Sequence, residues 1–166
     1  MSRAGFLLLL LAILLFLVTG CGKQDPVPLQ VGTHDIAVVF PSDWEHFEYG
    51  EQHQWRQDFN RIAIQDYGRM GTMIDLAIDR ALVKLRDDER REIASRDTLL
   101  VSGRDARMIA TWDHVSHEFP KRYLFVLNQN KLLVLYTMQG QFDLMEPTFT
   151  KMANSLAFVD TVATGH

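Results

Sequence analysis

The stretch RYLFVLNQNKLLVLYTM, residues 122–138, decides the fold. It holds two apolar runs joined by a polar turn at Asn128–Asn130, and each run has apolar side chains at both odd and even positions. Successive side chains of a strand point to opposite faces, so a strand that is apolar on both faces must be covered on both. The stretch therefore predicts two antiparallel strands inside a sheet with a layer on either side.

Amphipathic helices on both sides of this stretch in the sequence can supply the two layers. The first is expected to begin at a Thr72 cap, with Asp75 three residues on, and its apolar stripe consists of Ile74, Ile78, Ala81, Leu82 and Leu85. The closing helix has Pro147 near its start and a stripe of Met145, Phe149, Met152 and Leu156. It should cover one face of the sheet, and the first helix, or the early strands folded over, should cover the other.

Shorter strand patterns complete the expected sheet. A strand of alternating residues ends at Pro41, and a hairpin is expected from Trp44–Tyr49 and Gln52–Phe59 about Gly50–Glu51. Further strands are expected at Arg61–Tyr67, Thr98–Ser102 and Arg107–Ser116. The predicted fold class is α+β, an α-β-α sandwich with a mainly antiparallel sheet of about six strands covered by helices.

The N-terminal residues have the pattern of an export signal. Arg3 is followed by an apolar run from Phe6 to Val18, which is shorter than the about 20 residues that a spanning helix needs. Val18-Thr19-Gly20-Cys21 resembles the lipobox of bacterial lipoproteins. The resemblance implies cleavage between Gly20 and Cys21, a diacylglycerol thioether on Cys21 and acylation of the new amino terminus.

The lipoprotein resemblance also implies a location and a domain organisation. Gly22, where an Asp would favour retention at the inner membrane, favours the periplasmic face of the outer membrane if the host has two membranes. We expect a signal peptide at 1–20, a lipidated cysteine and proline-containing tether at 21–32, one globular domain at 33–159 and a tail at 160–166.

Composition narrows the possible functions. Cys21 is the only cysteine, so its lipidation leaves no thiol for a disulfide, a thiolate metal site or a nucleophile. The formal net charge is −4 at pH 7 and becomes more negative once Arg3 leaves with the signal peptide, which argues against a nucleic-acid partner.

The chain contains, in order, a strand ending Phe40-Pro41-Ser42-Asp43-Trp44, a long helix, a turn at Gly103-Arg104-Asp105-Ala106, and a final helix ending Asn154-Ser155-Leu156-Ala157-Phe158. This order of elements resembles the PsbP-like superfamily over about residues 33–158. Known members include extrinsic photosystem proteins, nuclear Ran-binding Mog proteins and DcrB-type bacterial lipoproteins. The resemblance implies an α-β-α sandwich and a protein that binds or helps to assemble other proteins.

The segment WEHFEYGEQHQW, residues 44–55, is the richest in candidate functional side chains. A hairpin here could bring His46 near His53, and Glu48 and Glu51 could join them around zinc or manganese. The same segment could instead dock a protein through Trp44, His46, Tyr49 and Trp55. A plain solvated hairpin, with the tryptophans in the core, is the third alternative, and all three remain open at this stage.

Catalytic patterns are weak in this sequence. It has no GxSxG elbow and no HExxH helix, and Ser102-Gly103 is expected in a turn. His114 and His117 stand three apart in an expected strand, so they point to opposite faces. The leading hypothesis is a lipid-anchored binding or assembly accessory protein of the cell envelope that acts on a protein partner without catalysis or cofactor. The alternative is a periplasmic divalent-metal-binding lipoprotein.

Overall fold

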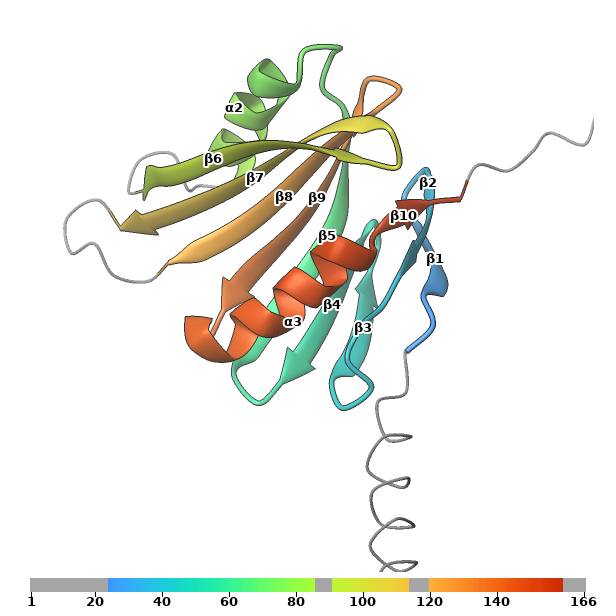
Figure 1. Cartoon of the computed structure of the whole chain (residues 1–166), viewed down its shortest axis with the longest axis vertical. Helices are drawn as coiled ribbons and strands as arrows, with labels where there is room; N and C mark the ends of the chain where they lie inside the picture. The colour runs from blue at the N-terminus through green and yellow to red at the C-terminus, as the bar shows by residue number, and fades with distance from the viewer. Residues whose placement is uncertain (1–23, 86–90, 114–119, 160–166) are drawn as a thin grey trace, which may run out of the picture.

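The computed structural model describes residues 24–85, 91–113 and 120–159. Within these residues it has two helices and ten strands (Figure 1). In chain order they are β1 (Val27–Val31), β2 (His34–Val38), β3 (Glu45–Tyr49), β4 (Gln52–Gln57), β5 (Asn60–Arg69), α2 (Ile74–Leu85), β6 (Arg91–Val101), β7 (Arg104–Asp113), β8 (Lys121–Asn128), β9 (Lys131–Gln139), α3 (Phe142–Ser155) and β10 (Ala157–Phe158).

The strands form two sheets. The larger has seven strands in the order β3-β4-β5-β9-β8-β7-β6, with every neighbouring pair antiparallel. The smaller has three strands in the order β1-β2-β10, also antiparallel. The α+β class with an antiparallel sheet is confirmed, but the expected single sheet of about six strands is too small. The strands that the sequence did not predict, β1 and β10, are the two edge strands of the small sheet.

The two apolar strands of residues 122–138 lie at the centre of the molecule as β8 and β9. Their register pairs Tyr123 with Tyr136 and Leu124 with Leu135. Tyr123 and Tyr136 belong to one buried cluster, together with α2 residues, whereas Leu124 and Leu135 belong to a second buried cluster with α3 residues. The prediction that these strands are covered on both faces is therefore confirmed.

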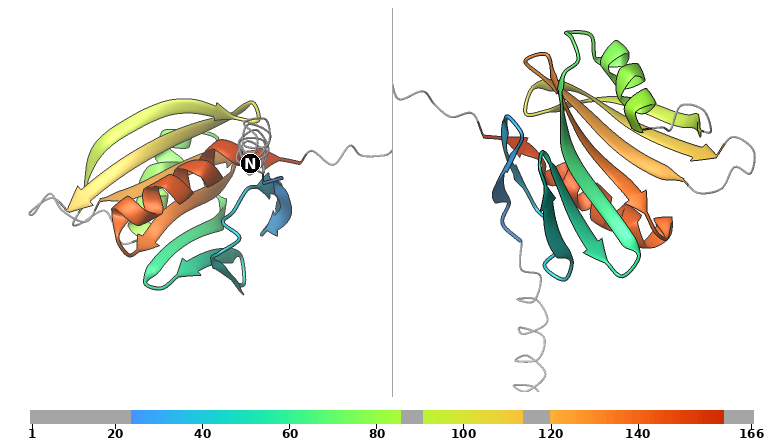
Figure 2. Two further views of the ribbon diagram at one scale, coloured as in Figure 1. Left: turned by 60° about the horizontal axis from the view of Figure 1, so that its bottom comes forward. Right: turned by 180° about the vertical axis from the view of Figure 1, so that it is seen from behind.

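Each of the two buried clusters lies between the large sheet and one covering helix. Helix α3 lies across one face of the large sheet (Figure 1), and α2 packs against the other (Figure 2). The small sheet covers the α3 side as well, since Val31, Ile36 and Val38 join the same core as α3 residues. Neither helix in the described residues is long and apolar enough to cross a membrane.

The expected tether is partly wrong. Val27–Val31 forms β1 and pairs with β2 over its whole length, so the folded domain begins before residue 33. Pro26 and Pro28 correctly indicated that this segment is not a helix, but they do not exclude a strand. Pro28 is tolerated because β1 is an edge strand of the small sheet, where a missing N–H can face away from the ladder. The predicted tail, residues 160–166, lies outside the described residues.

Helix ends differ from the sequence predictions. In α2 the first helical hydrogen bond joins the Ala77 amide to the Met73 carbonyl, so Met73, and not Thr72, occupies the cap position. Helix α3 begins at Phe142, so Pro147 lies inside it. Ala157 and Phe158, expected at the end of that helix, instead form β10 against β2.

Strand β6 is longer than the sequence indicated. It runs from Arg91 to Val101, whereas only Thr98–Ser102 was expected to be strand. Residues 92–98 are exposed, because β6 is an edge strand and is not covered on both of its faces. An edge strand exposed in this way needs no apolar alternation, so the pattern that reveals a strand is missing there. The connection to β7 is a two-residue turn at Ser102–Gly103, and Arg104–Ala106 already belongs to β7.

Candidate functional site

The β3–β4 hairpin positions the candidate residues of segment 44–55. The two strands are joined through Gly50 and Glu51, and Gly50 has a φ of 60°, the sign that a type II′ turn requires at its first central residue. The register sets Glu48 opposite His53 and His46 opposite Trp55. All four side chains therefore share one face of the hairpin.

Three of these side chains form a cluster of possible metal ligands, as the sequence suggested. His46 Nε2 lies 3.1 Å from His53 Nδ1, and Glu48 Oε1 lies 3.6 Å from His53 Nδ1. One ligand atom from each residue falls within 4.8 Å of the others. Glu51, the fourth predicted ligand, is exposed in the turn and is not part of this group.

Aromatic stacking fixes the two imidazoles. The His46 ring stacks on His53 at 5.3 Å, on Trp55 at 4.9 Å and on Phe40 at 6.1 Å between centroids. Burial lowers the pKa of His46 below its ordinary value, and His53 lowers it further against the opposing effect of Glu48. His46 is therefore a neutral imidazole near neutral pH, which is the form that binds metals.

The predicted docking residues fall into two groups. Trp55 has no exposed surface and Trp44 is also buried, so both are core residues that no partner can reach. Tyr49 and His46 are exposed. The exposed face of β3 carries Phe47 and Tyr49, whose rings stack 6.4 Å apart.

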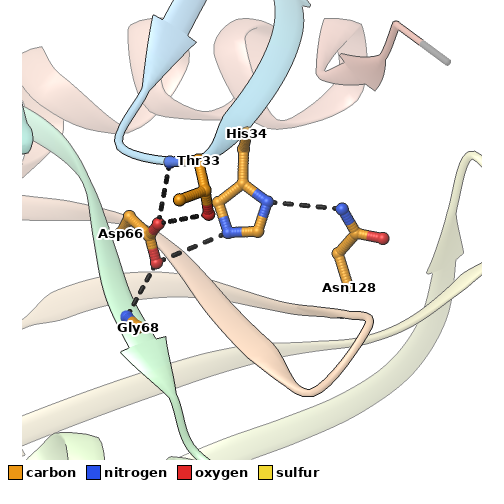
Figure 3. Close-up of polar contacts among 5 residues, drawn as sticks. All are labelled: Thr33, His34, Asp66, Gly68 and Asn128. Atoms are coloured by element: carbon orange, nitrogen blue, oxygen red, sulfur yellow. Dashed lines mark hydrogen bonds and ion pairs between the residues drawn. The ribbon is translucent and has the colours of Figure 1, made fainter. Parts of the chain in front are cut away.

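A second polar cluster, which the sequence analysis did not single out, lies where the small sheet meets the large one (Figure 3). Asp66 of β5 is buried and accepts hydrogen bonds from the Thr33 amide at 3.0 Å, the Thr33 hydroxyl at 2.9 Å and the Gly68 amide at 2.7 Å. His34 Nε2 lies 3.5 Å from the same carboxylate, and His34 Nδ1 is 3.3 Å from the Asn128 amide nitrogen. This cluster ties the β1–β2 turn to β5 and to the β8–β9 turn.

Burial and hydrogen bonding set the charge states of this second cluster. Burial by itself raises the pKa of Asp66, but the hydrogen bonds from Thr33 and Gly68 and the nearby His34 outweigh it, and the pKa is lowered overall. Burial lowers the pKa of His34 despite the attraction of Asp66. At neutral pH the pair is thus an ionised carboxylate beside a neutral imidazole. Such a pair suits a structural link between sheets.

The sequence does hold one signal for Asp66. Ile62, Ile64 and Asp66 alternate on the same face of β5, so a carboxylate occupies a position whose neighbours are core residues. A buried carboxylate needs hydrogen-bond donors. Two of the three donors belong to Thr33, 33 positions away, which no local pattern reveals.

Ser102, which the sequence places in a turn, has a structural role. Ser102 lies in the β6–β7 turn and accepts a hydrogen bond from the Phe158 amide, so its hydroxyl holds β10 in place. His114 and His117, and also Gly20 and Cys21, lie outside the described residues.

No protein-family model matches the chain, and no curated protein matches it by sequence. Its fold is similar to the solution structure of cyanobacterial PsbP (CyanoP) from Synechocystis sp. PCC 6803, with a TM-score of 0.59 and 13% identity over 84% of this chain and 96% of that one. It is also similar to LpqN of Mycobacterium tuberculosis, a protein involved in cell envelope biogenesis, with a TM-score of 0.50 and 10% identity over 81% and 91% of the two chains. These likenesses show a PsbP-like fold, and at such identities they show the fold alone.

Proposed function

We propose that this chain is a lipid-anchored accessory protein of the bacterial cell envelope, which binds a protein partner and catalyses no reaction. The lipobox-like Val18–Cys21 supports the anchor. The PsbP-like fold supports the accessory role, since it is shared with LpqN, a cell envelope biogenesis protein.

The observation that carries the partner-binding proposal is the aromatic patch on β3, formed by Phe47 and Tyr49. β3 is an edge strand of the large sheet, and Tyr49 is 59% exposed. The Arg56 guanidinium lies 4.8 Å from the centre of the Phe47 ring and is itself bonded to Glu45 at 2.6 Å, so the patch is held in one arrangement. A fixed aromatic surface loses little conformational entropy on binding.

The geometry favours one kind of partner segment. The outer edge of β3 offers backbone N–H and C=O groups to a further strand, and aromatic side chains beside a free edge favour strand addition. We therefore propose that an envelope protein binds by adding an extended segment along β3, over the aromatic patch.

Site-specific photocrosslinking in cells tests this proposal. A photoreactive phenylalanine analogue at Tyr49 should capture one partner reproducibly, whereas the same analogue at Leu100, 67% exposed in the opposite edge strand β6, should not. Cys21→Ser should move the protein out of the membrane fraction and abolish the crosslink. Equal capture from positions 49 and 100, or capture that survives loss of the anchor, would count against the proposal.

A further inference from the structure

Two imidazole nitrogens and one carboxylate oxygen converge on one face of the β3–β4 hairpin. His46 Nε2 and His53 Nδ1 are 3.1 Å apart, and the carboxylate of Glu48 lies 3.6 Å from His53 Nδ1. This arrangement follows from the register of the two-residue hairpin, in which Glu48 and His53 are opposite and His46 is diagonal to His53.

The spacing is that of ligands around one small ion. Zinc binds imidazole nitrogen at about 2.0–2.1 Å, so two nitrogens at the corners of a tetrahedron around it stand about 3.3–3.4 Å apart. The His46–His53 separation of 3.1 Å is close to this value. Glu48 must approach further, and its side chain, 66% exposed, is free to rotate toward the nitrogens.

A hydrogen bond between the two histidines accounts for only part of the cluster. If His53 Nδ1 carries a proton, His46 Nε2 and Glu48 Oε1 both compete for it. If His46 Nε2 instead donates to His53 Nδ1, the Glu48 carboxylate 3.6 Å away receives no proton from either of these nitrogens. A cation can be shared by all three atoms.

The ligands are also held ready and remain accessible. His53 is 5% exposed, and the His46 ring is stacked between Trp55 and its other aromatic neighbours. On the other side Glu48 and His53 line an open hollow of about 620 Å³ between the hairpin and the β1–β2 turn. An ion could therefore enter without any rearrangement of the core.

We propose that His46 Nε2, His53 Nδ1 and the Glu48 carboxylate form a binding site for a zinc-type divalent ion, with a remaining coordination position open to solvent. Two imidazoles and one carboxylate favour zinc over magnesium and calcium, which prefer oxygen ligands alone. The open position distinguishes the site from a closed structural zinc site. The site does not depend on the proposed partner binding.

Metal titration of the full chain tests this proposal. The lipidated protein, purified in detergent through an affinity tag without histidines, should retain one zinc per chain after dialysis. His46→Asn and Glu48→Gln should each weaken zinc binding at least about tenfold, since even loss of a group that only orients a zinc ligand costs roughly 10- to 100-fold. Cobalt should give the intense visible absorption of a tetrahedral or five-coordinate nitrogen and oxygen site, and His46→Asn should lose it.

Matched controls keep the outcome decisive. Glu51→Gln removes an exposed carboxylate of the same hairpin that lies outside the cluster, and it should leave zinc affinity unchanged. Circular dichroism should show that all variants stay folded, which is expected because His46 and Glu48 are exposed. The proposal is overturned if the unaltered chain retains no zinc, if it prefers magnesium or manganese, or if His46→Asn and Glu48→Gln bind zinc as tightly as Glu51→Gln.

Discussion

Replacing Asp66 should destabilise the protein more than any change at an exposed carboxylate. Its buried oxygens accept three hydrogen bonds, two from Thr33 and one from Gly68. Hydrogen bonds to an ionised group each contribute about 1.5–3 kcal/mol. Full loss of the three bonds would cost about 4.5–9 kcal/mol. Thr33 is itself exposed and its donors can be partly rehydrated, so we expect Asp66→Ala to cost less, about 3–4 kcal/mol.

Urea unfolding measures this cost. Tryptophan fluorescence is a suitable signal because Trp44 and Trp55 are buried in the core beside the small sheet. The midpoint should fall at an unchanged slope, and the melting temperature should fall by about 10 °C. Such a loss is a large part of the about 5–15 kcal/mol that stabilises an ordinary domain.

Three further variants separate the contributions of the charge and of single hydrogen bonds to the free energy of unfolding. Asp66→Asn keeps an acceptor for Thr33 but not the charge, and should cost about 2 kcal/mol. Thr33→Val removes only the hydroxyl bond and should cost about 1 kcal/mol. Asp97→Ala removes an exposed carboxylate of β6 and should stay within about 0.5 kcal/mol of the unaltered chain. The reasoning is refuted if Asp66→Ala costs less than about 1 kcal/mol, or no more than Asp97→Ala.

Other expectations follow from the same structure. A Cβ on Gly32 would lie 2.5 Å from Asp66 Oδ2, whereas one on Gly103 meets nothing within 4 Å, and both residues have positive φ. Gly32→Ala should therefore be clearly more destabilising in urea than Gly103→Ala, which should cost about 1 kcal/mol; equal costs would contradict the contact. The lowered pKa of His34 means that the unfolded chain takes up its proton first, near the ordinary value of 6.5, so stability should fall as the pH drops below that value. The lowered pKa of Asp66 adds a further loss at lower pH, as that carboxylate is protonated below its ordinary value of 3.8. Urea midpoints between about pH 5 and 7 measure the first effect, and His34→Phe should make them less dependent on pH. Arg122 donates two hydrogen bonds to a glutamate of α3, so Arg122→Ala should lower the free energy of unfolding in urea by about 1 kcal/mol, and no change would show that this half-exposed contact is dispensable.

The sequence allowed the centre of the fold to be predicted because its signals are local. Strands β8 and β9 are apolar on both faces, and that pattern requires two covering layers wherever the partners come from. The proximity of His46 and His53 could also be predicted, because a two-residue hairpin sets its own register.

The features that were missed depend on distant partners or on exposed edges. β1 contains a proline and most of β6 is exposed, so neither shows the alternation of a half-buried strand. Trp44 and Trp55 could be core or surface residues by composition, and only the position of α3 and the small sheet buries them. Thr33, which provides two of the three donors to Asp66, is brought to it by the packing of one sheet on the other.

The small sheet has a consequence for the order in which the chain can fold. β2 lies between β1, at the start of the described chain, and β10, at its end. Synthesis proceeds from the amino terminus, so β2 must wait for Phe158 before its second edge is paired and Ser102 is bonded. Contacts that join sequence-distant segments form slowly. The small sheet therefore cannot be completed before Ala157 and Phe158 have been made.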